Sequence, residues 1–180
     1  MRSHTAPAPS SASFVPALAL PSDAFGVYLH WPFCASKCPY CDFNSHVRAG
    51  GIDEARFVAA YRRELRHWAK LAPGRTVGSI FFGGGTPSRL GGAGVARALG
   101  LVRERFPLAP GAEVTIEANP DDITEAAVEA WLEAGVNRLS IGSQSFDDAV
   151  LAWMHRSHEG AGIERAVAAV YGGHPATVVQ

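Results

Sequence analysis

The 180-residue sequence has few cysteines, almost no net charge and no long apolar run, and each shortage excludes a class of protein. Lysine plus arginine number 16 and aspartate plus glutamate 17, so the net charge is −1. We therefore expect no nucleic-acid partner, because such binding rests on clustered positive charge. No apolar run reaches the ~18 residues that a membrane span needs, so we expect no transmembrane segment. The three cysteines form an odd set, which makes a poor disulfide framework.

The composition is that of a globular protein with one ordinary domain. Apolar residues make up 47% of the chain, which is enough to build a core. Residues 1–24 are rich in alanine, proline and serine, and their only apolar stretch, 14–20, is broken by Pro16. We expect a disordered tail there rather than a secretory signal, followed by a core domain over residues 25–180. Because we expect no secretory signal, we also expect a cytoplasmic location.

Short apolar runs alternate with segments of helical period, which predicts repeated βα units. We expect strands at residues 25–29, 77–82, 113–118, 137–141 and 176–179. One helix is expected to begin behind Asp53 and another to run from Thr124 to Gly135. Further helices are expected at 94–105, 147–154 and 162–171. The fold class is α/β with a parallel sheet, and the chain is too short for a closed eight-unit barrel of about 250 residues.

The unusual segments of the sequence all follow predicted strands. The cysteines come after the first strand, and a glycine triplet at 83–85 follows the second. Asn119-Pro120 follows the third strand, and residues 142–146 follow the fourth. Because chemistry in parallel α/β folds gathers at the carboxyl ends of strands, we expect these segments to form one site.

Cys34, Cys38 and Cys41 have the spacing C-x3-C-x2-C, which predicts a metal site. An iron–sulfur cluster normally takes four cysteines, so three would leave one iron open for another ligand. Zinc is the alternative, with His46 or His30 as the fourth ligand of a tetrahedral site. A third interpretation, three thiols buried on one helix face, is disfavoured by the polar residues around them.

Four motifs in order resemble the radical S-adenosylmethionine (SAM) superfamily. They are similar to the branch that contains oxygen-independent coproporphyrinogen III oxidase (HemN) and the heme chaperone HemW. The motifs are YLHWPFCASKCPYCDFNSH at 28–46, FFGGGTPS at 81–88, EANP at 117–120 and NRLSIGSQSF at 137–146.

The resemblance implies an incomplete parallel (β/α) barrel of the radical SAM type, with about four to five βα units. It implies a [4Fe-4S] cluster held by Cys34, Cys38 and Cys41, with SAM bound to the open iron. SAM would then be split to a 5′-deoxyadenosyl radical when the cluster is reduced. The positions that match cofactor contacts of the family are Tyr28, Tyr40, Gly84, Gly85, Thr86, Glu117, Gln144 and Arg156. Structural roles are expected for Asn119, Asn137 and Arg138.

The resemblance is closer to the chaperone than to the oxidase. HemN-type oxidases carry a further cysteine two residues after the third, whereas Cys41 is followed here by Asp42-Phe43. We therefore expect a HemW-like heme chaperone, with heme or a porphyrinogen as ligand and an electron donor protein as partner. Oxidative decarboxylation of coproporphyrinogen III is the alternative, and a zinc-stabilised non-redox domain is a weaker one. His155 stands where the family usually has glycine, and family members are about twice as long, so the core domain is expected to be truncated.

Overall fold

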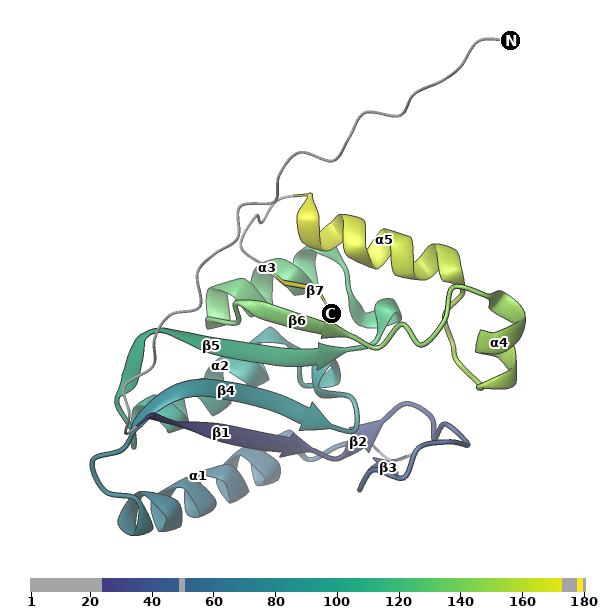
Figure 1. The fold of residues 1–180 in the computed structure, drawn as a ribbon. Helices are drawn as coiled ribbons and strands as arrows, with labels where there is room; N and C mark the ends of the chain where they lie inside the picture. Colours follow the sequence, from purple (N-terminus) through teal and green to yellow (C-terminus); the bar gives the residue numbers. More distant parts are fainter. Residues whose placement is uncertain (1–23, 49–50, 173–177, 180) are drawn as a thin grey trace, which may run out of the picture.

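The computed structural model describes residues 24–48, 51–172 and 178–179. Five parallel strands form one sheet, in the order in which they occur along the chain (Figure 1). They are β1 (Ala24–Trp31), β4 (Thr76–Gly84), β5 (Leu108–Ala118), β6 (Arg138–Ile141) and β7 (Val178–Val179). Successive parallel strands joined by helices are the wall of a (β/α) barrel, and the predicted fold class is confirmed.

Helices connect the strands, and most of them lie along one side of the sheet, while the shortest lies beyond the carboxyl ends of the strands (Figure 1). They are α1 (Glu54–Leu71), α2 (Gly91–Arg103), α3 (Glu125–Ala134), α4 (Asp148–Trp153) and α5 (Gly160–Tyr171). Two short 3-10 helices, η1 (Pro87–Leu90) and η2 (Pro120–Asp122), follow β4 and β5. A separate parallel pair joins β2 (Phe33–Cys34) to β3 (His46–Val47). Among the described residues, none of the helices is long and apolar enough to cross a membrane.

The core lies between the sheet and its helices. Alternate side chains of each strand point to this layer, as the two-residue period of a strand requires. The largest buried strand residues are Trp31, Ile80, Phe82, Ile116 and Leu139. The opposite face carries polar and aromatic side chains, including Tyr28, which is 57% exposed.

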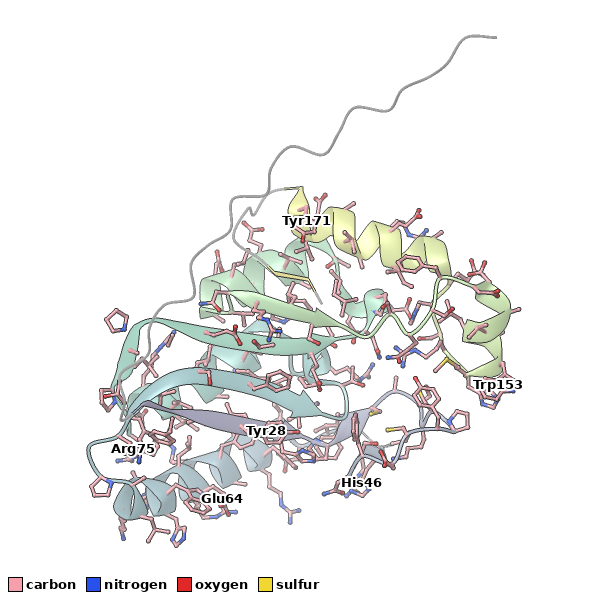
Figure 2. The ribbon with its side chains drawn as sticks, viewed as in Figure 1. Tyr28, His46, Glu64, Arg75, Trp153 and Tyr171 are labelled. Atoms are coloured by element: carbon pink, nitrogen blue, oxygen red, sulfur yellow. The ribbon has the colours of Figure 1, made fainter. Side chains whose placement is uncertain are left out.

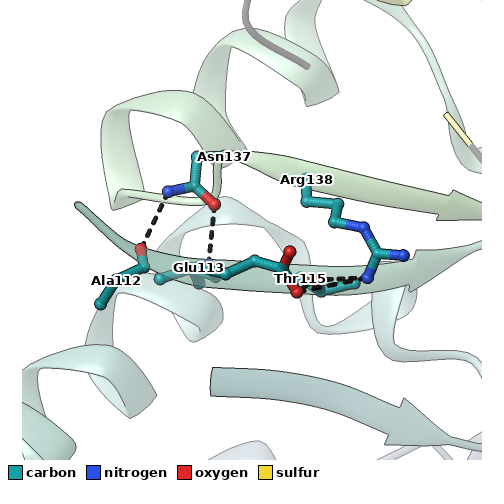
Figure 3. A network of polar contacts seen from close by, with 6 residues as sticks. Ala112, Glu113, Thr115, Asn137 and Arg138 are labelled. Atoms are coloured by element: carbon teal, nitrogen blue, oxygen red, sulfur yellow. Dashed lines mark hydrogen bonds and ion pairs between the residues drawn. The ribbon is translucent and has the colours of Figure 1, made fainter. Parts of the chain in front are cut away.

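Asn137 and Arg138 fix the register between β5 and β6 (Figure 3). Asn137 Oδ1 accepts a hydrogen bond from Val114 N at 2.7 Å, and its Nδ2 donates to Ala112 O at 3.0 Å. Arg138 donates to Glu113 Oε1 at 3.3 Å. Their side chains therefore join adjacent strands, which confirms the structural roles expected for both.

Helix α3 begins and ends where the sequence predicts. The Thr124 side chain accepts a hydrogen bond from Ala127 N at 3.2 Å, and Gly135 ends the helix in the left-handed region. We expect Thr124→Ala to lower the free energy of unfolding by about 1 kcal/mol, because it leaves a helix-end N–H without its acceptor. Thr124→Ser keeps the oxygen and is the control. Urea denaturation measures both, and equal losses would show that the methyl group rather than the cap matters.

Several predicted boundaries differ from the structure, most of all the start of β5, which lies at Leu108 rather than at residue 113. Strand β1 begins at Ala24, which pairs with Thr76, one residue before the predicted strand; residues 1–23 of the predicted tail lie outside the described residues. Helix α2 begins at Gly91 rather than at residue 94. A Cβ at Gly92 would approach the Cβ of Ala130 to 2.6 Å, so the glycine is needed for close packing of α2 on α3. Of the predicted strand at 176–179, only residues 178–179 are described, and they form β7.

Candidate cofactor site

A cavity of about 350 Å³ lies at the carboxyl ends of the strands. The loop that holds the three cysteines, residues 34–45 and here named the cysteine loop, forms one wall. The other walls come from residues that end or follow β4, β5 and β6 and from the link between α4 and α5. The labelled His46 and Trp153 mark this end of the molecule in Figure 2. The strand-end segments singled out in the sequence therefore do meet in one place.

The three cysteines are free thiols, each partly exposed, and all three line the cavity. Backbone hydrogen bonds shape the loop that carries them. Cys41 N donates to Cys38 O at 3.1 Å, which closes a turn between these two ligand candidates. His46 N donates to Pro32 O at 2.6 Å and brings the two ends of the cysteine loop together.

The two histidines offered as zinc ligands face other partners. The His30 ring bonds to Asn44 O through Nε2 at 3.0 Å, and His46 Nε2 lies 3.1 Å from Asn44 Oδ1. Neither ring lines the cavity. Within the described part of the chain, no three His, Cys, Asp or Glu side chains converge as ligands of one metal ion. The three thiols line the cavity without His30 or His46, so the donor set fits a cluster with one open iron better than a zinc site closed by either histidine.

Arg156 joins three segments of the cavity wall. One guanidinium nitrogen donates to Asn119 Oδ1 at 2.7 Å and to Gly142 O at 2.9 Å. The other lies 3.5 Å from both Cys38 Sγ and Tyr40 Oη. Arg156 Nε is buried and has no hydrogen-bond partner among the described residues. A buried donor in a cavity wall is suited to an anionic ligand group, which a SAM carboxylate supplies.

Backbone strain gathers beside this cavity. Gln144 and His155 are the non-glycine residues with positive φ in the described ranges, at 67° and 55°. Only glycine adopts such angles without cost. His155 directly precedes Arg156, and the glycine that is usual in the family at this position suits a backbone with positive φ.

Gly85 brings β4 against the cysteine loop. Its N–H donates to Trp31 O at 2.7 Å, and Thr86 N donates to Phe33 O at 3.0 Å. A Cβ at Gly85 would lie 2.8 Å from Pro32 C and 3.0 Å from Cys34 Sγ. The absence of a side chain at this position therefore lets the thiol and the end of β4 share one wall.

Six of the eight predicted cofactor contacts line the cavity: Tyr40, Gly85, Thr86, Glu117, Gln144 and Arg156. Gly84 and Tyr28 do not. Gly84 N donates to Glu117 Oε2 at 3.2 Å and so helps to fix the position of this carboxylate. The Tyr28 hydroxyl lies 3.1 Å from His30 Nδ1 on the open face of the sheet. Burial, and then the nearby Glu117 charge, raises the Tyr28 pKa.

Burial raises the pKa of Glu117, and the hydrogen bond from Gly84 N only partly offsets this. The folded chain therefore holds the Glu117 proton more tightly than the unfolded chain, so stability falls as the pH rises through the raised pKa. We expect Glu117→Gln to remove the pH-dependent loss of stability that Glu117 causes, because the amide keeps an acceptor for Gly84 N and carries no charge. Urea midpoints from pH 4 to pH 7 test this: the two proteins should converge at low pH and separate, with the variant more stable, as the pH rises. Parallel curves would contradict it.

Several residues of the cavity wall were not among the predicted cofactor contacts, including Asn119, Lys37 and Ser45. Asn119, for which a structural role was expected, lines the cavity and accepts the bond from Arg156, so that expectation is too narrow. Lys37 and Ser45 also line it and contact each other. Asn119 directly follows a strand, and this position was the signal available in the sequence. Nothing in the sequence pairs Lys37 with Ser45.

A parallel sheet in chain order, with a C-x3-C-x2-C loop at its carboxyl end, is the arrangement of a radical SAM domain. The chain matches the radical SAM superfamily over residues 28–173 and belongs to it. Membership implies a [4Fe-4S] cluster and SAM as cofactors.

Within the superfamily, the chain is similar to heme chaperones and to a porphyrin enzyme. It is 45% identical over 147 residues to the heme chaperone HemW of Mycobacterium tuberculosis (strain CDC 1551 / Oshkosh), covering 80% of this chain and 38% of the relative. It is 45% identical over 132 residues to HemW of Escherichia coli K12, covering 73% and 35%. The solved structure of coproporphyrinogen III oxidase (HemN) from Escherichia coli matches with a TM-score of 0.76 and 31% identity, covering 87% and 36%. The chain thus spans little more than a third of each of these proteins.

Proposed function

We propose that this chain is the cluster- and SAM-binding part of a HemW-like heme chaperone that acts in heme trafficking. The observation that carries the proposal is the cavity in which three free thiols meet Arg156 and the end of β4. The similarity to two HemW proteins and the Asp42-Phe43 pair after Cys41 support the chaperone over the oxidase. The three free thiols suit a reducing compartment, and the cytoplasmic location stays a prediction.

Cys34, Cys38 and Cys41 are proposed to bind one iron each and to leave the fourth iron to SAM. When bound, the cluster would supply the single electron that starts radical chemistry at the SAM sulfonium. Gly84, Gly85 and Thr86 are proposed to approach the methionine part of SAM, and the position of Gly85 and Thr86 in the cavity wall supports this.

The remaining cavity side chains are proposed to position SAM through complementary polar groups. Glu117 accepts hydrogen bonds from SAM hydroxyl or ammonium groups, and Gly84 holds it in place. Arg156 offers its unpartnered N–H to the SAM carboxylate, and Gln144 and Tyr40 contact the cofactor from neighbouring walls. Tyr28 contributes from the open face of the sheet beside Glu117.

Oxidative decarboxylation of coproporphyrinogen III is the second candidate function. The likeness to the HemN structure supports it, because the core fold and the cavity are compatible with either activity. Heme or a porphyrinogen is accordingly the proposed ligand, and an electron donor protein is the proposed partner.

Anaerobic reconstitution with iron and sulfide tests the proposal. We expect about four irons per chain and a reduced-cluster spectrum that changes when SAM is added. Heme titration should then show binding, while incubation with coproporphyrinogen III, SAM and a reductant should leave that substrate unchanged. Conversion to protoporphyrinogen would instead establish the oxidase, and one zinc with no cluster would overturn both.

A further inference from the structure

The side chain of Lys37 folds back onto the far end of the cysteine loop. Lys37 Nζ donates to Phe43 O at 3.0 Å, to Ser45 O at 3.4 Å and to Ser45 Oγ at 2.8 Å. An ammonium group has three N–H donors, so all three are used inside the loop. Lys37, which lies between two of the cysteines, thus fixes the position of Ser45.

The Ser45 hydroxyl lies between this ammonium group and a cysteine. Ser45 is only 7% exposed, and its Oγ is 3.9 Å from Cys41 Sγ. An ammonium group accepts no hydrogen bond, so the single hydroxyl proton of Ser45 must be directed away from Lys37. A cysteine that binds metal is a thiolate and can only accept. With the proposed cluster bound, the contacts therefore run from Lys37 to Ser45 to Cys41.

We propose that Lys37 and Ser45 form a hydrogen-bond relay that tunes the reduction potential of the cluster through Cys41. The inference rests on the proposed cluster site. Hydrogen bonds to the cysteine sulfurs of an iron–sulfur cluster are one of the determinants of its potential. A donor at Cys41 Sγ stabilises the more negative, reduced cluster and so raises that potential. Lys37 acts through Ser45 and is a positioning residue.

Ser45→Ala tests the relay on the reconstituted chain. Ser36→Ala is the matched control, because Ser36 lines the same cavity but has no such contact with a cysteine sulfur. In a dithionite titration followed by electron paramagnetic resonance, we expect Ser45→Ala to lower the ratio of reduced to oxidised cluster about three- to tenfold at the wild-type midpoint. A tenfold change corresponds to about 59 mV for one electron. Ser36→Ala and the hydroxyl-preserving Ser45→Thr should stay near the wild-type midpoint.

Lys37→Met tests the order of the relay. We expect a downward shift of the midpoint in the wild-type background and a smaller one in the Ser45→Ala background, because part of the Lys37 effect passes through Ser45. Equal shifts in both backgrounds would overturn the relay and leave only a direct charge effect.

The remaining outcomes separate the relay from the proposed function. A wild-type chain that binds no cluster overturns the proposed function and the relay with it. An unchanged midpoint in Ser45→Ala overturns the relay alone. Should Ser45→Ala lose its iron, recovery of iron and of the midpoint in Ser45→Thr supports the role of the hydroxyl, and failure to recover them overturns it.

Discussion

Cys34→Ser, Cys38→Ser and Cys41→Ser are each expected to reduce reconstituted iron from about four per chain to background. Each thiol is assigned to a separate iron, so a single loss leaves two protein ligands for the cluster. Serine is close in size, and the three cysteines are only partly buried, so folding should be little affected. Iron and sulfide analysis beside a circular dichroism spectrum separates loss of the cluster from loss of the fold.

The outcome for each cysteine stands on its own. A variant that keeps about four irons and a SAM-dependent spectrum would remove that thiol from the ligand set. Ser36→Ala again serves as the control, since it alters the cysteine loop without touching a sulfur.

Gly85→Ala is expected to lower the free energy of unfolding by about 1–3 kcal/mol and to impair cluster assembly. The added Cβ meets backbone atoms of Pro32 and Phe33 at 2.8 and 2.9 Å and Cys34 Sγ at 3.0 Å. Backbone cannot rotate away as a flexible side chain does, so the cysteine loop must shift. Urea denaturation and iron content measure the two effects.

Gly100→Ala is the matched control for Gly85→Ala. Gly100 lies inside α2, and a Cβ there meets nothing within 4 Å. Alanine should therefore stabilise the helix by about 0.5–1 kcal/mol and leave the iron content unchanged. Equal behaviour of the two variants would show that the close approach at Gly85 has no consequence.

The elements that could be predicted from the sequence are those set by local chemistry. The caps at Asp53 and Thr124 use side-chain oxygens within three residues of the N–H groups that they accept from. Strand periodicity is equally local, so the parallel order and the meeting of the strand ends followed from general rules. The four motifs contain the residues that we predict to bind the metal and the cofactor, except Arg156.

The missed features depend on contacts between distant segments or on packing. The predicted helix at 94–105 leaves out Gly92, whose small size lets α2 pack closely on α3. The β2–β3 pair is too short to show a period, and the relay from Lys37 depends on the folded shape of one loop. Likewise, Asn119 belongs to the cavity because of Arg156, which is 37 residues away.

The contact between Arg156 and Cys38 spans 118 residues and sets an order of assembly during synthesis. At about 5–20 residues per second, the ribosome needs roughly 6–24 s to make the chain between the two. For that time the cysteine loop exists without the opposite wall, and its thiols are open to oxygen and to stray metal ions. Iron and sulfide supplied after synthesis of the segment that carries Arg156 would meet thiols that already have this contact.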